Sequence, residues 1–417
     1  MPDMHRRGFL RLGLGAAAAL ASRFGAAHAA VASPVVVQIF LRGGVDALSV
    51  LPVRDGANRA TYLAGRPTIQ IAGPAVVTNT VGLGMHPSLA ATRALYEAGE
   101  AVFVLGAGCA NQTRSHFEQE AFIEGGDPVT QRPTGYLNRA LSALGGASVP
   151  YQAIAIQDAM PLSLRGPSAA MRVPALDAFG KLQASGITAA TTFSERVEAL
   201  AIPPLGIHST AAQIGTAAGN LLDSIADLQH IVALAPAVSP LASYGTSAFA
   251  DNLRDAARIL AVESRVRIVE VDCDKFDTHA MQGNASGGAL RDKLAELDKA
   301  LGAFVADARR LGFWNRTVVV VISEFGRTVK ENGSKGTDHG RGGVAWVAGP
   351  TAIVRGKRIL APTGFSLAPA ALTDGRDLPV TADLRSITGE VLTRHLGVPS
   401  LATVFPGWTP STLGLLV

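Results

Sequence analysis

Aspartate, glutamate and histidine gather in four polar segments of this chain, and each segment directly follows an apolar run. The apolar runs cover residues 35–41, 101–105, 267–271 and 317–322. Surface loops are polar in general, but Lys, Asn and Ser would be expected to dominate them. The residues concerned are Asp46 after the first run, Thr113, Arg114, Ser115 and His116 after the second, Asp277 and His279 after the third, and Glu324, Arg327, Asp338 and His339 after the fourth.

These residue types together indicate a metal site. Carboxylates and imidazoles that are brought together repel one another or lose hydration unless a cation compensates them. The same groups are the usual protein ligands of a divalent ion such as Zn²⁺, Mn²⁺, Mg²⁺ or Ca²⁺. Asp277 and His279 are two residues apart, so they face the same way in an extended segment. Asp338 and His339 are adjacent, so we expect one to bind the ion and the other to orient a neighbour.

Each residue taken alone has a plainer interpretation, a helix cap for an aspartate or a satisfied core side chain for a histidine. The metal hypothesis rests on the whole set, because parallel strands deliver the residues that follow them to one edge of a sheet.

The apolar runs predict that sheet. Six runs, at 35–41, 101–105, 151–156, 267–271, 317–322 and 344–349, are continuously apolar rather than alternating, which is typical of strands covered on both faces. Residues 287–314 carry leucines at three- and four-residue steps and lead through Gly312 into the next strand. The prediction is therefore an α/β fold, a three-layer α/β/α domain over residues 30–417 with a mostly parallel sheet.

Residues 175–265 differ from the rest. They are rich in alanine, helical in pattern and without a convincing strand. We interpret them as a helical insertion over one side of the sheet, which would serve as a lid, or as ordinary helices packed on the sheet's face.

The N-terminus predicts an export signal over residues 1–29. Arg6-Arg7 precede Phe9-Leu10, a short apolar stretch and an Ala27-His28-Ala29 exit. The paired arginines are typical of the twin-arginine (Tat) export machinery, and the apolar stretch is too short to span a membrane. The mature protein is therefore expected in the periplasm or outside the cell. The Tat machinery exports folded proteins, which is consistent with a metal that is bound before export.

Charge and cysteine content exclude several classes. Without the four arginines and one aspartate of residues 1–29, the 37 basic and 33 acidic residues become 33 and 32. This balance gives no reason to expect nucleic acid or an anionic membrane surface as a partner, and no later stretch is long enough for a membrane span. Cys109 and Cys273 lack C-x-x-C spacing. One disulfide or two buried thiols both remain open.

Several stretches resemble a Tat-exported bacterial family, domain-of-unknown-function family 1501, which is grouped with the alkaline phosphatase and sulfatase superfamily. The matching stretches span nearly the whole mature chain and include FLRGGVDALSVLPV, YLAGRPTI, NQTRSHFEQEAF, FDTHAMQ and VVVVISEFGRTVKENGSKGTDHGRGGVAWVAG. The resemblance implies an alkaline-phosphatase-like fold.

The resemblance also implies roles for single residues. It makes Asp46 a metal ligand and Ser115, or else Thr113, a nucleophile at a helix N-terminus where N–H groups would hold phosphate or sulfate. Arg114 or Arg327 would neutralise developing charge. Glu324 replaces a metal-binding Asp. Asp277, His279 and His339 match further ligands.

Two departures from the superfamily pattern are visible. Phe325 stands where an imidazole is expected, so a second metal would lack a ligand unless Asp338 or His116 supplies it. Asp277, His279 and His339 are therefore expected to form the better site, and Asp46 with Glu324 a weaker all-oxygen site for Mg²⁺ or Mn²⁺. Cys109 lacks the Pro and Arg that formylglycine-type sulfatases require.

Two functions follow as hypotheses. The first is an exported metal-dependent hydrolase of phosphate or sulfate esters, acting on a small anionic ester or an extracellular polymer. The alternative, which Phe325 favours, is a catalytically inactive hydrolase fold that serves as a secreted binding or assembly protein. A redox enzyme has little support, because the Gly-rich residues 105–110 are a weak cofactor pattern and no cysteine cluster accompanies them.

Overall fold

One mixed sheet organises the chain in the computed structural model, which describes residues 32–111, 113–146, 150–176 and 242–417. The strand order is β4-β3-β5-β1-β6-β7-β2-β8, with β9 beside β2. The strands are β1 (Val35–Leu41), β2 (Ala101–Gly108), β3 (Ala153–Ala155), β4 (Met171–Arg172), β5 (Ile268–Cys273), β6 (Thr317–Ser323), β7 (Gly343–Ala348), β8 (Arg358–Leu360) and β9 (Ala382–Asp383). All pairings are parallel except those of β7 with β2 and β6.

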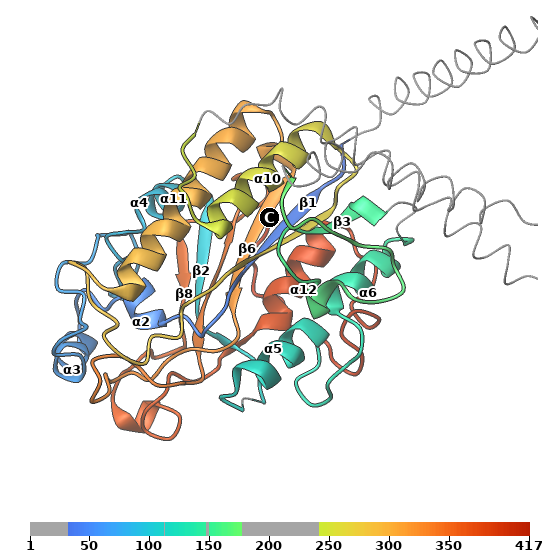
Figure 1. The fold of residues 1–417 in the computed structure, drawn as a ribbon. Helices are drawn as coiled ribbons and strands as arrows, with labels where there is room; N and C mark the ends of the chain where they lie inside the picture. The colour runs from blue at the N-terminus through green and yellow to red at the C-terminus, as the bar shows by residue number, and fades with distance from the viewer. Residues whose placement is uncertain (1–31, 112, 147–149, 177–241) are drawn as a thin grey trace, which may run out of the picture. The chain divides into compact units, whose positions relative to one another are not determined.

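The strands are buried on both faces, as their apolar sequences predict. Along β1, Val35, Val37, Ile39 and Leu41 join one core, whereas Val36 and Phe40 join the other. The first core is covered by α4 (Ala90–Glu97), α10 (Ala248–Val262) and α11 (Ala289–Arg310), and the second by α5 (His116–Gly125), α6 (Tyr136–Ala143) and α12 (Leu384–Arg394) (Figure 1). The prediction of an α/β fold with a mostly parallel sheet between helices is confirmed.

The helix predicted over 287–314 is α11. Its leucines, from Leu290 to Leu301, are buried against the sheet. It ends where Gly312 adopts a left-handed φ of 82°, and the Gly312 N–H donates to the carbonyl of Arg309. Two short helices, α2 (Ala47–Val50) and α3 (Asn58–Gly65), follow β1.

The predicted export signal, residues 1–29, lies outside the described residues. Most of the predicted helical insertion does too, since residues 177–241 are not described. The described part of that segment includes α10, which packs against α11 and β5. There the simpler interpretation, a helix on the face of the sheet, holds. Among the helices that the structure describes, none is long and apolar enough to cross a membrane.

The parallel strands β1, β2, β5 and β6 end at a common edge. The antiparallel strand β7 begins at that edge, so the loop from Glu324 to Gly342 leaves and returns there. The fold therefore brings all four polar segments to one place.

Candidate metal centre

Three histidines and one aspartate bring their side chains to one point at this edge. His116 opens α5, Asp277 and His279 follow β5, and His339 comes shortly before β7. The two Nε2 atoms of His279 and His339 lie 2.8 Å apart. Asp277 Oδ1 lies 3.0 Å from Nε2 of His279 and 3.3 Å from Nε2 of His339, and Asp277 Oδ2 lies 3.4 Å from Nε2 of His116. We call these four residues the His–Asp cluster.

Each imidazole of the cluster is fixed through its other nitrogen. Nδ1 of His116 lies 2.7 Å from Glu324 Oε1, Nδ1 of His279 lies 3.3 Å from Asp338 Oδ1, and Nδ1 of His339 lies 2.7 Å from the Arg114 carbonyl oxygen. Carboxylates and carbonyls only accept, so each Nδ1 carries the proton and donates it. Each Nε2 then presents a lone pair to the cluster, which is the tautomer that metal-binding histidines adopt.

The cluster fits a divalent ion by its donors and its spacing. Ligand atoms of His116, Asp277 and His339 lie within 4.8 Å of one another, and Nε2 of His279 adjoins those of Asp277 and His339. Nε2 of His116 is buried and has no hydrogen-bond partner among the described residues. It lies 3.4 Å from Asp277 Oδ2, so a metal ion or a proton on this nitrogen would offset the charge of the carboxylate. Three imidazoles with a carboxylate suit Zn²⁺ or Mn²⁺.

Glu324 lies behind His116 rather than facing the cluster. It is fully buried, and it accepts hydrogen bonds from the Gly43 N–H at 2.7 Å and the Ser323 hydroxyl at 2.8 Å. Burial by itself raises the pKa of Glu324, but the hydrogen bond with His116 and those from the protein around it outweigh burial and lower the pKa. The same hydrogen bond raises the pKa of His116. The sequence-based expectation of Glu324 as a ligand is replaced by a positioning role.

A second group of potential ligands adjoins the first. Ligand atoms of His116, Glu120 and Glu324 lie within 4.8 Å of one another. Because Nδ1–H of His116 donates to Glu324, only the Nε2 side has a free lone pair, which favours the His–Asp cluster. Glu120 belongs to a network around Arg42, which pairs with Glu120 at 3.1 Å and with Glu124 at 2.6 Å.

Asp46, expected as a metal ligand, is engaged by other side chains in the structure. Its Oδ1 accepts from Arg66 at 3.0 Å and from the N–H of Leu48, and its Oδ2 accepts from Arg66 at 2.5 Å, Ser49 at 2.7 Å and Gln282 at 2.8 Å. Both Asp46 and Arg66 are buried. Every lone-pair direction of the carboxylate is thus used inside the protein, and Asp46 anchors the start of α2. Asp46 and Glu324, the two residues of the predicted all-oxygen site, are thus both engaged in hydrogen bonds inside the protein.

Arg114 also differs from expectation. Its guanidinium donates to Asp374 at 2.9 Å and to Asp377 at 2.6 Å, away from the cluster. Its backbone adopts a positive φ of 56°, and its carbonyl oxygen is the acceptor for His339. The residue contributes through its main chain, which the sequence does not indicate.

Ser115 and Thr113 lie at the N-terminus of α5. Ser115 is the N-cap residue, and its hydroxyl makes no capping hydrogen bond. Its N–H donates to the Thr113 hydroxyl at 3.2 Å. Ser115 precedes His116, so its hydroxyl is carried on the same turn as a member of the cluster.

Arg327 lies beneath Asp277. Its buried guanidinium donates to Asp277 Oδ1 and to the carbonyls of Gly43, Gly44 and Thr337. Burial alone would raise the pKa of Asp277, but the hydrogen bond and charge of Arg327 lower it to about 2. Asp277 is therefore held ionised.

The apolar ring of Phe325 packs against two histidines of the cluster. Its buried ring lies 4.8 Å from the rings of both His116 and His339, centroid to centroid. Gly44 allows this, because a Cβ at Gly44 would come within 2.5 Å of the Phe325 ring. The imidazole that Phe325 cannot supply comes instead from His116.

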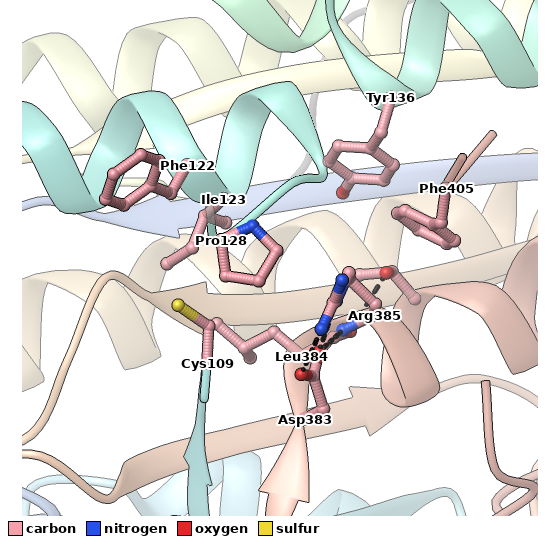
Figure 2. A pocket seen from close by; sticks show the side chains of 10 residues that line it. Cys109, Phe122, Ile123, Pro128, Tyr136, Asp383, Leu384, Arg385 and Phe405 are labelled. Carbon is pink, nitrogen blue, oxygen red and sulfur yellow. Dashed lines mark hydrogen bonds and ion pairs between the residues drawn. The ribbon is translucent and has the colours of Figure 1, made fainter. Parts of the chain in front are cut away.

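Both cysteines are free and buried, so the two-thiol alternative holds. Figure 2 shows Cys109 at the end of β2 beside Ile123 and Pro128 of the α5 side. Its Sγ lies 2.6 Å from Gln119 Nε2 and 3.1 Å from the Asn111 carbonyl oxygen. Burial raises the pKa of Cys109 to about 11 and also raises the pKa of Cys273. Neither is an activated nucleophile.

Comparisons with known proteins give a family and distant likenesses. Residues 83–399 match the family described as protein of unknown function (DUF1501). Steryl-sulfatase of Rattus norvegicus is 32% identical over 133 residues, a match that covers 25% of this chain and only 23% of that protein.

Among solved structures, the PsFucS1 sulfatase from Pseudoalteromonas sp. has a TM-score of 0.36 at 11% identity, covering 88% of this chain and 68% of that one. Phosphonate monoester hydrolase of Agrobacterium radiobacter has a TM-score of 0.37 at 13% identity, covering 91% and 78%. Likenesses this weak carry no argument about the site.

Proposed function

Since this chain belongs to the DUF1501 family, we propose that it is a metal-dependent hydrolase of phosphate or sulfate esters. The observation that carries the proposal is that ligand atoms of His116, Asp277 and His339 lie within 4.8 Å of one another, with His279 Nε2 beside those of Asp277 and His339. The segment that is similar to a steryl-sulfatase supports a sulfate or phosphate ester as the substrate class.

The residues of the His–Asp cluster would hold the ion. When bound, a divalent ion would polarise an ester oxygen and offset the charge that develops on it. The positioning groups on the three Nδ1 atoms keep the rings from rotating away. Arg327 donates to Asp277 and keeps it ionised, so this carboxylate stays available to the ion.

Ser115 is the proposed nucleophile. The first N–H groups of α5 have no partner within the helix, and they lie beside the Ser115 hydroxyl, where an anionic phosphate or sulfate would accept from them. Thr113 is the second candidate. Its hydroxyl accepts from the Ser115 N–H, so it also holds the Ser115 backbone in place.

We further propose that the protein acts after Tat export, in the periplasm or outside the cell. The support is the sequence of residues 1–29, with its paired arginines and its Ala-His-Ala exit. The substrate is then a small anionic ester or an extracellular polymer.

Metal content and hydrolysis test the proposal together. Protein purified without chelator is expected to hold divalent metal by mass spectrometry and to hydrolyse p-nitrophenyl phosphate or p-nitrophenyl sulfate. His279→Ala and His339→Ala should remove the ion and the activity. The matched control is His395→Gln, since His395 Nε2 contacts only the carbonyls of Val35 and Arg316, both at 3.1 Å.

Absence of any bound divalent ion in the wild-type protein would refute the metal centre. Tight binding of an ion without hydrolysis of any ester would instead support the binding-protein alternative.

A further inference from the structure

A polar hollow lies at the same edge of the sheet as the His–Asp cluster. Its volume is about 340 Å³, within the range of about 300–1,000 Å³ that is usual for small-molecule sites. One aromatic ring and several hydroxyl groups make up its wall. The side chains that matter are Thr381, Asp383, Ser386, Trp408, Thr409 and Ser411.

The aromatic ring of the hollow is held rigidly. Arg385 lies over Trp408, with its guanidinium carbon 3.9 Å from the ring centroid, and Phe405 meets the same ring edge-on at 5.9 Å. Asp383 in turn accepts from Arg385 at 2.9 and 2.8 Å, an ion pair that Figure 2 shows beside Phe405. The Trp408 ring is therefore positioned before any ligand arrives, which lowers the entropy cost of binding.

The hydroxyl groups of the hollow are arranged on its other side. Ser386 and Ser411 lie 3.0 Å apart through their Oγ atoms, and the Ser411 N–H donates to Ser386 Oγ. Thr381 and Thr409 are exposed. A hydroxyl donates once and accepts twice, so these groups suit a ligand that is itself rich in hydroxyl groups. Asp383 and Arg385 form an ion pair, so their charges offset each other.

The hollow is joined to the cluster by residues 377–381. Asp377 accepts from Arg114, whose carbonyl oxygen holds His339. The Leu378 carbonyl accepts from the Gly342 N–H at 2.8 Å, and the Thr381 N–H donates to the Gly106 carbonyl at 2.9 Å. One end of this segment therefore supports the candidate metal centre, and the other end lines the hollow.

We infer that the hollow binds a neutral sugar ring. A sugar ring has one face of C–H groups, which the negative face of an aromatic ring attracts, and a rim of hydroxyl groups. Trp408 matches the face, and the Ser and Thr hydroxyls match the rim. The link to catalysis rests on the proposed function, under which a sugar held here would be part of a sulfated or phosphorylated carbohydrate.

Tryptophan fluorescence tests the sugar site without catalysis. Of the three tryptophans, Trp314 and Trp346 are 6% and 0% exposed, whereas Trp408 is only partly buried. Titration with a panel of neutral hexoses and pentoses should give a saturable change for at least one sugar, and ethylene glycol at equal hydroxyl concentration should give none. The change should vanish in Trp408→Phe and persist in the matched variant Trp314→Phe.

Saturation-transfer NMR with the same sugar detects binding directly, so it distinguishes loss of the fluorescence change from loss of binding. Trp408→Phe should still bind, because the phenyl ring preserves stacking, whereas Trp408→Ala should bind about tenfold more weakly. Thr381→Val, which keeps the side-chain shape, should also weaken binding. No saturable binding across the panel, or binding unchanged in both Trp408→Ala and Thr381→Val, would overturn the inference.

Hydrolysis kinetics then separate this inference from the proposed function. Thr381→Val should raise KM for hexose 6-sulfates or 6-phosphates more than it raises KM for the p-nitrophenyl esters. If the protein binds a sugar but hydrolyses no ester, the sugar site stands and the proposed hydrolase activity is rejected. Hydrolysis with KM unchanged in Thr381→Val for every sugar ester would reject the sugar site as part of the substrate site and keep the hydrolase.

Discussion

Replacing Glu324 by glutamine separates a positioning residue from a metal ligand. In the structure this carboxylate holds Nδ1 of His116 at 2.7 Å and accepts from Gly43 and Ser323. Glutamine has nearly the same shape, and its carbonyl can accept from both His116 and Gly43. Its amide can donate to Ser323 Oγ while the serine hydroxyl donates to the Leu41 carbonyl, 2.8 Å away. The hydrogen bonds survive, and only the negative charge is lost.

The size of the effect follows from that substitution. Loss of an outer partner of a metal-bound histidine lowers metal affinity about 10- to 100-fold, or by about 1.4–2.7 kcal/mol. Glu324→Gln keeps the hydrogen bond, so its effect should lie near tenfold. Glu324→Ala leaves the buried Gly43 N–H without an acceptor and frees the His116 ring, so its effect should approach 100-fold.

A competitive titration with a zinc indicator measures both variants, with circular dichroism to verify folding. Glu331→Gln is the matched control, because Glu331 accepts from Thr68 and Ile69 and, among the described residues, has no hydrogen bond with a member of the cluster. Complete loss of the ion in Glu324→Gln, as large as the loss in His279→Ala, would show that Glu324 binds the ion directly. Affinity unchanged in Glu324→Ala would show that His116 is not part of the site. Either result refutes the assignment.

Three further predictions follow from the structure. Asp46→Asn leaves Arg66 buried without its carboxylate, so it should lower the free energy of unfolding by about 3–5 kcal/mol in chemical denaturation while metal affinity per folded molecule stays unchanged. Ser115→Ala should abolish ester hydrolysis with metal content unchanged by mass spectrometry; retained turnover would move the nucleophile to Thr113 or to water. Burial, and then the nearby charges of Glu124 and Asp272, raise the pKa of Glu270 from 4.5 to about 8, so the folded state holds a proton that the unfolded state releases between these values, and stability should fall as pH rises through that window. Glu270→Gln should flatten this fall in thermal melting at pH 5–8, and an unchanged slope would contradict the assignment.

The sequence predicts the fold well because the strands are buried on both faces. Continuous runs of Val and Ile favour buried strands, and β1 and β6 begin where the runs begin. The carboxyl ends of β5 and β6 then locate Asp277, His279 and His339. What the runs do not reveal is the antiparallel direction of β7, since burial on both faces looks the same in either direction.

The sequence predicts where the site residues lie better than it predicts which groups their side chains contact. Asp46 follows a strand as a ligand would, but Arg66 lies 20 residues later and takes it up in a bidentate pair. An arginine after a helix gives no sign of this pairing. His116 is the imidazole nearest the predicted helix start, so the sequence does indicate it as a candidate ligand. Its pairing with Glu324 joins residues 208 positions apart, and no local pattern predicts such a contact.

The distances in sequence within the His–Asp cluster have a kinetic consequence. His279 and His339 are 60 residues apart, and His339 and the Arg114 carbonyl that fixes it are 225 apart. The strands that bring these residues together also pair over long range, as Val35 does with Thr317, so we expect the cluster to be complete only after the strands have paired. An ion held by these side chains would find no ligand set in the folding transition state, so it would leave the folding rate nearly unchanged. It would act almost wholly by slowing unfolding, and the lifetime of the folded chain, more than its rate of formation, would depend on the metal.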